Sequence, residues 1–272
     1  MGAVDSARAC GAEAAQIWAS NPRGWAHPNV PPDLAAAFGQ AWAAARIGPL
    51  FLHAPYMVNV ASPNPEFRAR SVELARATVA LADQVGAAGV VIHAGAGGAG
   101  TPRSVALGRA VDSLSMVADA AASTMVLIEL TAGGAGSVAA TFGQAAELLH
   151  AAGRHRRLGL CADTCHLFAS GYALESPEGV TACFDEVRRL GLVRRLLLIH
   201  ANDSKFPRGG HRDAHVHIGD GHIGLEGFSA ILANPVVRQV PLVCETPGRL
   251  EDHARNISVL RGLADDRPGT RP

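Results

Sequence analysis

Short apolar runs recur along the chain and alternate with stretches of helical periodicity. The runs are four to six residues long, and most of them end in one polar side chain. Strands that are buried on both faces read as continuous apolar runs, so this alternation predicts parallel strands covered by helices. The expected strands are residues 14–19, 49–53, 89–93, 124–130, 158–163, 196–201 and 240–245.

Seven strand and helix units follow one another without a linker or a change in composition. This series predicts the α/β class and a TIM-type (β/α) barrel, a fold that usually has eight strands. We therefore expect one barrel domain over residues 1–263 that lacks its first strand, and a disordered tail at 264–272. Helices are expected at 4–12, 33–46, 65–85, 103–122, 137–152, 225–234 and 250–263, and another ends near Gly191.

Six of the expected strands end in a side chain that can bind a metal. A single such residue is more often a satisfied polar group or a helix cap. Six that converge on one face without partners would be costly to bury, so they require mutual pairing or a metal, and we favour a metal. The six are His53, His93, Glu129, Asp163, His200 and Glu245.

Three more candidate ligands lie close to these strand ends. His166 follows Asp163 by three residues, so it can reach a neighbouring metal. Asp213 and His215 have i, i+2 spacing in an extended loop, which puts both side chains on one side. Nitrogen and oxygen ligands without an obligatory thiolate suit zinc, with manganese or iron possible at one site.

The nine candidates support two or three ions at the usual ligand number per ion. Charge favours three Zn²⁺ per chain, because three divalent ions outweigh the four carboxylates and would attract a phosphodiester anion. Clustered ions generate hydroxide near neutral pH and stabilise the attacking and leaving oxygens of phosphoester cleavage. Hydrolysis of a phosphodiester is therefore the natural hypothesis.

Four other side chains are rival ligands. His211, His217 and His222 lie in the polar segment after residue 201, where we expect them to support ligands or to face solvent. Cys165 lies between Asp163 and His166 and would face away from Asp163 in an extended chain. We therefore expect a small buried residue there.

The composition is that of a globular protein: 272 residues, 48% hydrophobic and 18% charged. The formal net charge is zero, so composition alone does not indicate a nucleic-acid binder. One basic loop stands out. Lys205, Arg208 and Arg212 follow the strand that ends at His200, where they could meet phosphates or simply be solvated. We see no membrane span and no signal peptide, and expect a cytoplasmic, nucleoid-associated protein.

At these residues the chain resembles endonuclease IV, the metal-dependent apurinic/apyrimidinic endonuclease built on a TIM barrel. The similarity runs from about residue 3 to residue 263. It rests on LIELTAGGAG, CADTCHLFASGY, HANDSK, RDAHVHIGDGHIG and ETP. The resemblance implies one zinc at His53, His93 and bridging Glu129, a second at Glu129, Asp163, His200 and Glu245, and a third at His166, Asp213 and His215.

The resemblance also implies a function in base excision repair. The family cleaves double-stranded DNA 5′ to an abasic site, leaves a 3′-hydroxyl and removes 3′ blocking groups. Glu129 and Glu245 would take part in catalysis, with a metal-bound hydroxide as the nucleophile. Arg23, Tyr56 and Met57 would enter the duplex at the lesion, although Gly24 replaces a larger polar residue. We expect a monomer.

Two alternatives and one question of chain length remain open. A sugar isomerase or epimerase of the same superfamily would need about four ligands, mostly carboxylates, and not His166, Asp213 and His215 together. A truncated, non-catalytic DNA- or metal-binding relative is the other alternative. Family members open with a strand, whereas this chain begins inside the helix that should follow it. Our hypothesis is that roughly 10 to 15 residues precede Met1; a true seven-stranded variant is the alternative.

Overall fold

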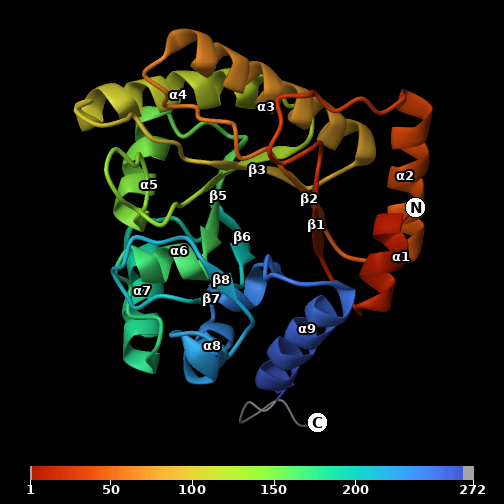
Figure 1. The fold of residues 1–272 in the computed structure, drawn as a ribbon, viewed down its shortest axis with the longest axis vertical. Coiled ribbons are helices and arrows are strands. Elements are labelled where there is room, and N and C mark those ends of the chain that lie inside the picture. Colours follow the sequence, from red (N-terminus) through yellow and green to blue (C-terminus); the bar gives the residue numbers. More distant parts are fainter. Residues whose placement is uncertain (1, 266–272) are drawn as a thin grey trace.

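The main sheet of the computed structural model, which describes residues 2–265, is parallel throughout. Its order, β1-β2-β3-β4-β5-β6-β9, follows the chain, and helices surround it (Figure 1). The predicted seven-stranded (β/α) barrel is thus confirmed. The strands are β1 (Ala15–Trp18), β2 (Leu50–His53), β3 (Gly89–His93), β4 (Met125–Glu129), β5 (Leu158–Asp163), β6 (Leu196–His200) and β9 (Leu242–Val243).

The helices start and stop at the residues that cap them. The side chain of Asn64 accepts the Phe67 N–H at 3.0 Å, Pro65 opens α3, and Gly86 ends it at φ 71°. Among residues 2–265 no helix is long and apolar enough to cross a membrane. The helices are α1 (Gly2–Ala9), α2 (Pro32–Ala45), α3 (Pro65–Val85), α4 (Arg103–Asp119), α5 (Phe142–Ala151), α6 (Thr164–Ala169), α7 (Pro177–Arg189), α8 (Gly224–Ala233), the 3-10 helix η1 (Val237–Gln239) and α9 (Leu250–Asp265).

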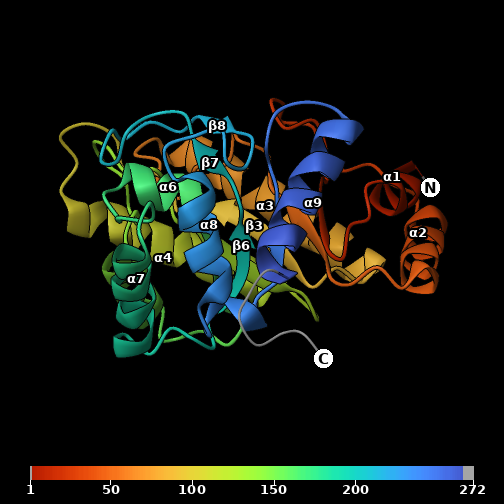
Figure 2. The same ribbon diagram turned by 90° about the horizontal axis from the view of Figure 1, so that it is seen from below.

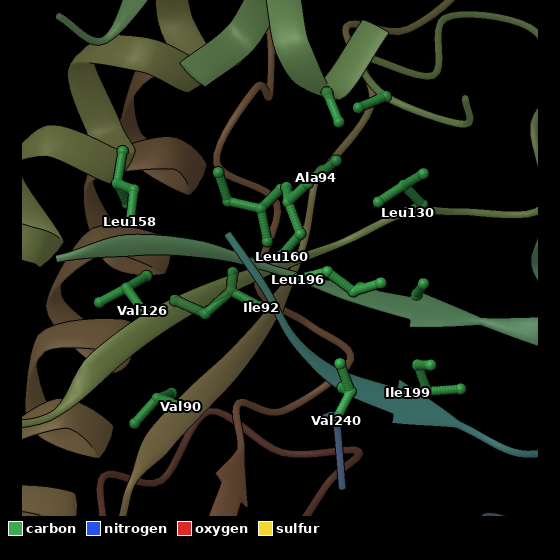
Figure 3. Packing of buried hydrophobic residues seen from close by; sticks show 14 of the residues in the cluster. Val90, Ile92, Ala94, Val126, Leu130, Leu158, Leu160, Leu196, Ile199 and Val240 are labelled. Atoms are coloured by element: carbon green, nitrogen blue, oxygen red, sulfur yellow. The ribbon is translucent and has the colours of Figure 1, made fainter. Parts of the chain in front are cut away.

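Two layers of apolar side chains pack against the sheet. The larger layer lies between the strands and the surrounding helices, and Figure 3 shows Val90, Ile92 and Val126 in it. The smaller layer fills the barrel interior, and β2 to β6 each contribute one residue to it. Because side chains alternate across a strand, neighbouring residues belong to different layers. The interior residues are Phe51, Val91, Leu127, Cys161 and Leu198.

The barrel is open between its first and last strands. Strand β9 pairs with β6 at Leu242 and Val243, and within the described chain β1 and β9 do not pair with each other. A cavity of about 770 Å³ is lined by residues of both strands. The end of β9 is therefore held by a neighbouring strand on one side alone.

Several element boundaries differ from the sequence predictions. The helix expected at 137–152 begins at Phe142, because Ser137 bridges to Ala96 and Thr141 caps the helix by accepting the Gln144 N–H at 3.2 Å. The strand expected at 240–245 is shortened to β9. The helix expected at 103–122 ends at Asp119. Residues 264–265 of the expected tail belong to α9, and 266–272 lie outside the described residues.

The long polar segment after β6 contains a short hairpin that the sequence did not predict. Strands β7 (Asp203–Ser204) and β8 (His215–Val216) pair antiparallel, with Ser204 opposite His215. Figure 2 shows this hairpin among the loops at one end of the barrel. It brings His215 to the end at which β5 and β6 terminate.

Candidate metal centre

The strand-end ligands face the barrel interior because of simple alternation. His93 lies two residues after Val91, and Glu129 two residues after Leu127, and both preceding residues belong to the interior layer. Residues two apart on a strand point to the same side, so each ligand continues an interior row. The same spacing holds on β2, β5 and β6. The polar side chains therefore converge at the carboxyl ends of the strands.

All nine predicted ligands come together in the structure. They form groups whose nitrogen and oxygen ligand atoms lie within 4.8 Å of one another. Glu129 belongs to two of these groups, as the resemblance implied. Three groups contain the nine predicted ligands: His53, His93 and Glu129; Glu129, Asp163, His200 and Glu245; and His166, Asp213 and His215.

Backbone carbonyls fix which nitrogen of three imidazoles carries the proton. Nδ1 of His53 lies 2.6 Å from the Ala54 carbonyl, and Nδ1 of His166 lies 2.9 Å from the Leu130 carbonyl. A carbonyl can only accept, so Nδ1–H donates in both rings, and when the ring is neutral the lone pair lies on Nε2. His215 follows the same pattern with the Glu245 carbonyl at 3.3 Å. Metal-ligating histidines are usually oriented in this way.

Two buried nitrogens of the ligand cluster lack hydrogen-bond partners. Nε2 of His166 and Nε2 of His215 lie 3.2 and 3.1 Å from Oδ1 of Asp213, yet neither makes a hydrogen bond of acceptable geometry. Buried polar atoms of this kind are uncommon in folded proteins, and each needs an explanation. A cation between the three side chains would satisfy both lone pairs and the carboxylate. The donor set therefore fits a metal.

Glu129 lies at the centre of the cluster and is completely buried. Its Oε2 lies 3.0 Å from Nε2 of His53 and 3.2 Å from Nε2 of His93. Its Oε1 lies 3.2 Å from Nδ1 of His200. Burial opposes ionisation of this carboxyl, but His93 and His200 outweigh burial and hold its pKa well below the usual range. The carboxylate stays charged, as a bridging ligand must.

The imidazoles are shifted in the opposite direction. Burial lowers the pKa of His215, but Asp163 and Asp213 outweigh it and raise that pKa to about 9. Burial likewise lowers the pKa of His93, His166 and His200, but nearby carboxylates, joined at His200 by the Cys161 thiol, outweigh burial and raise these pKa values. Protonated imidazoles thus neutralise the carboxylates of the metal-free protein. Metal binding must release those protons.

Both carboxylate oxygens of the candidate ligand Asp163 accept hydrogen bonds from neighbouring parts of the chain. Its Oδ1 accepts the His166 N–H at 2.9 Å and so caps α6, which begins directly after β5. Its Oδ2 accepts a bond from the side-chain amide of Asn202 at 2.6 Å. The Asn202 oxygen in turn accepts the Glu245 N–H at 2.7 Å. Asn202 therefore ties two ligands together, a role that the sequence analysis missed.

A second buried carboxylate holds the loop that follows His215. Asp203 accepts the backbone N–H groups of Gly219, Ile223 and Gly224 at 3.0, 2.9 and 3.2 Å. Asp203 belongs to none of the ligand groups. Its bonds fix the path of the chain between β8 and α8, and so stabilise the hairpin that carries His215.

The rival ligands occupy different positions. Among the described residues, His211, His217 and His222 belong to none of the ligand groups, and Nδ1 of His217 lies 3.1 Å from the Asn256 amide. Cys165 is buried, as expected, but it lies in α6 and not in an extended chain, so it does not face away from Asp163. It forms an alternative group with Asp163 and His215. Burial raises its pKa to about 11, which favours the neutral thiol.

The expected wedge residues lie in two connected loops beside the ligands. The Tyr56 N–H donates to the Pro22 carbonyl at 2.9 Å, which links the loop of Tyr56 to that of Arg23. The Tyr56 side chain is 55% exposed, and its ring lies 4.7 Å from Trp18 and 5.9 Å from His93, centroid to centroid. Arg23 is exposed and Met57 is half-buried. A large ring thus projects to solvent next to the candidate centre.

The three basic residues after β6 are all exposed. Arg208 lies 3.5 Å from Glu175, and the guanidinium of Arg212 lies over the Phe206 ring at 4.5 Å. Neither contact buries the charge. Because these residues lie within the segment that separates β7 from β8, their positive charge is held near the third ligand group.

The fold and the convergent ligand groups define a (β/α) barrel with a candidate polynuclear metal centre. A family model described as a xylose isomerase-like TIM barrel matches residues 4–263. A probable endonuclease 4 of Streptomyces avermitilis is 39% identical over 262 residues, covering 95% of this chain and 84% of its own. A probable endonuclease 4 of Methanoculleus marisnigri is 39% identical over 270 residues, covering 96% and 94%. The chain belongs to the endonuclease IV family of these barrels.

Solved structures agree with this assignment. Endonuclease IV from Thermus thermophilus superposes with a TM-score of 0.87 at 30% identity, covering 98% of this chain and 94% of that one. A D-tagatose 3-epimerase-like protein gives a TM-score of 0.70 at 19% identity, covering 93% and 88%. The second likeness shows the shared fold alone.

Proposed function

We propose that this chain is a metal-dependent apurinic/apyrimidinic endonuclease that hydrolyses the DNA backbone 5′ to an abasic site and leaves a 3′-hydroxyl. Its substrates would be double-stranded DNA with abasic sites or 3′ blocking groups, which places it in base excision repair. The names of its relatives and the fit to the Thermus thermophilus enzyme support this proposal. We further propose three zinc ions per chain and a monomer that acts on DNA in the cytoplasm.

One observation carries the proposal more than any other: the third ligand group. His166, Asp213 and His215 add a site beyond the four-ligand group that a sugar isomerase needs. Their two buried nitrogens without hydrogen-bond partners support a bound cation in this group. Three divalent ions would give the centre a net positive charge, which suits a phosphodiester better than a neutral sugar.

The chain's own residues would divide the work between holding the ions and presenting the substrate. Clustered divalent ions supply an activated water and offset the negative charge on the attacking and leaving oxygens. Glu129, whose two oxygens face different ligand groups, would hold these groups at a fixed separation. Glu245 is the strand-end carboxylate with partial exposure, 20% of its side chain, so it borders the space that substrate would enter.

The loops would supply the recognition of damaged duplex. An enzyme that acts on a nucleotide inside a duplex must first unstack that nucleotide. Side chains inserted between the neighbouring bases offset the free energy that unstacking costs. Tyr56, Met57 and Arg23 are available for this because they lie on connected loops beside the ligands. Lys205, Arg208 and Arg212, which lie between β7 and β8, would contact phosphates.

A comparison of substrates tests the function. The zinc-loaded chain is offered a duplex with one tetrahydrofuran abasic analogue and, separately, ketose sugars. We expect cleavage of the duplex, its loss in His166→Ala, and its retention in His211→Ala, a histidine outside the ligand groups. Epimerisation of a sugar without duplex cleavage would refute the proposal.

A further inference from the structure

The strand-end ligands are arranged around the barrel, and the opening between β1 and β9 interrupts this arrangement next to Glu245. Glu245 lies two residues beyond β9, which pairs with β6 alone, and the neighbouring β1 lies across the cavity. Nothing in the backbone pairing of the described chain therefore connects Glu245 to β1. A ligand carboxylate at an unpaired sheet edge needs another anchor to keep its geometry.

Gln16 of β1 makes that connection. Its Nε2 lies 2.6 Å from Oε1 of Glu245, and its Oε1 lies 2.9 Å from Nε2 of His200. One side chain thus spans from the first strand to the ends of the last two strands of the sheet. Gln16 itself is half-buried and belongs to none of the ligand groups.

The chemistry of the partners fixes the orientation of the Gln16 amide. A carboxylate can only accept, so the NH₂ group must face Glu245 and the carbonyl oxygen must face His200. That oxygen also only accepts, so Nε2 of His200 must carry a proton. In the neutral ring the lone pair then lies on Nδ1. Nδ1 faces Glu245 Oε2 at 2.9 Å, Glu129 Oε1 at 3.2 Å and Asp163 Oδ2 at 3.8 Å.

His200 differs in this respect from three other imidazoles of the cluster. Backbone carbonyls select the tautomer of His53, His166 and His215. His200 takes its acceptor from a side chain on a strand 184 residues away in sequence. A substitution at position 16 can therefore remove this control, whereas no single substitution removes a backbone carbonyl.

We propose that Gln16 is a positioning residue that connects β1 to two ligands at the opposite side of the barrel opening. It selects the tautomer of His200 that can bind a metal through Nδ1, and it holds Oε1 of Glu245 by a hydrogen bond. The inference rests on the metal-binding part of the proposed function. Its effect is confined to the group Glu129, Asp163, His200 and Glu245, because the side-chain hydrogen bonds of Gln16 in the described structure go to Glu245 and His200, which belong to that group alone.

Zinc titration of metal-free protein against a chelator of known affinity tests this. In Gln16→Ala one zinc equivalent should bind about 10- to 100-fold more weakly, as is usual when a residue that orients a ligand is lost. The other equivalents and the melting temperature of the metal-free protein should not change. Gln16→Glu should weaken the same equivalent, because it sets a second carboxylate against Glu245. Gln40→Ala, on the exposed face of α2, is the matched control and should bind as wild type.

Double variants locate the affected equivalent. Adding Gln16→Ala to Glu245→Ala should weaken no zinc equivalent other than the one that Glu245→Ala already weakens, whereas adding it to Asp213→Ala should weaken a second equivalent besides the one that Asp213→Ala affects. Wild-type affinities in Gln16→Ala would overturn the inference, and so would equal weakening of all equivalents with a lower melting temperature. The titration contains no DNA. A wild type that binds zinc as expected but does not cleave abasic duplex would refute the proposed function and leave the role of Gln16 intact.

Discussion

Oε1 of Glu129 lies 3.2 Å from Nδ1 of His200, and neither side chain is exposed to solvent. The other oxygen of the same carboxylate faces His53 and His93. One buried carboxylate thus contacts imidazoles of two ligand groups. Buried charge without a counter-charge is strongly unfavourable, so this arrangement depends either on protonated imidazoles or on metal ions.

Glu129→Gln should remove metal from two sites at once. Elemental analysis of dialysed wild-type protein should find about three metal ions per chain, at least two of them zinc. The variant should keep one at most, lose cleavage activity and retain its far-ultraviolet circular dichroism. Glu226→Gln, in the first turn of α8, is the control and should keep the wild-type metal content. A stoichiometry of one or less in active wild-type protein would contradict this account.

Arg23→Ala and Tyr56→Ala should impair cleavage of abasic duplex far more than hydrolysis of a small 3′-phosphate ester. Base stacking on an aromatic ring contributes roughly 1–3 kcal/mol, so Tyr56→Ala should lose roughly 5- to 150-fold on duplex. An unstacked substrate does not need the wedge. Steady-state kinetics on both substrates measure the difference, and equal losses on both would show that the residues act through folding.

Binding of abasic duplex should weaken steeply with salt. The slope of log K against log salt concentration changes by about 0.9 for each phosphate contact, so single alanine variants of Lys205, Arg208 and Arg212 should each flatten it by that amount. The controls are Arg189→Ala and Arg194→Ala, exposed residues at the opposite end of the barrel. Unchanged slopes in the first set would exclude these contacts.

The metal-free protein should lose stability as pH rises from 6.5 to above 9. Burial lowers the pKa of His215, but Asp163 and Asp213 outweigh burial and raise that pKa from 6.5 to about 9. A pKa that is higher in the folded state stabilises the fold fully below the unfolded value, and this stabilisation is lost as pH rises through the folded value. The melting temperature should therefore fall by several degrees over this range.

Two variants isolate the contribution of His215. His215→Gln should flatten the dependence of the melting temperature on pH, while His27→Gln, an exposed histidine, should not. The zinc-loaded protein should not follow the same trend, because zinc binds the neutral imidazole. Parallel pH profiles for wild type and His215→Gln would show that this pair of carboxylates does not hold the proton.

The sequence was sufficient for the strands, which read as continuous apolar runs, and for the convergence of the six candidate ligands that end those runs. An interior apolar residue and the ligand two positions later share one face, and this pattern is visible in the chain as printed. The sequence did not show where a tertiary contact takes a residue out of an expected helix. Ser137 has reasonable helical neighbours, yet it bridges to Ala96, a contact between loops of different units. Element boundaries of this kind depend on tertiary partners.

The supporting residues were missed for a related reason. Gln16 interrupts an apolar strand run and Asn202 follows the strand that ends at His200, so each is an unexpected polar residue near a ligand. Their partners lie 229 and 39 positions away, at Glu245 and Asp163. No local spacing connects such residues. A polar residue on the interior face of a predicted strand, next to expected ligands, was the signal that could have found Gln16.

The most direct test of the central claim is the chemistry of the product ends. Zinc-loaded protein is incubated with a duplex that contains one natural abasic site, and the fragments are analysed by mass spectrometry. Hydrolysis 5′ to the site predicts a 3′-hydroxyl on the upstream fragment and the sugar phosphate on the downstream fragment. No incision, or an upstream fragment that ends in an unsaturated aldehyde from elimination, would contradict the account.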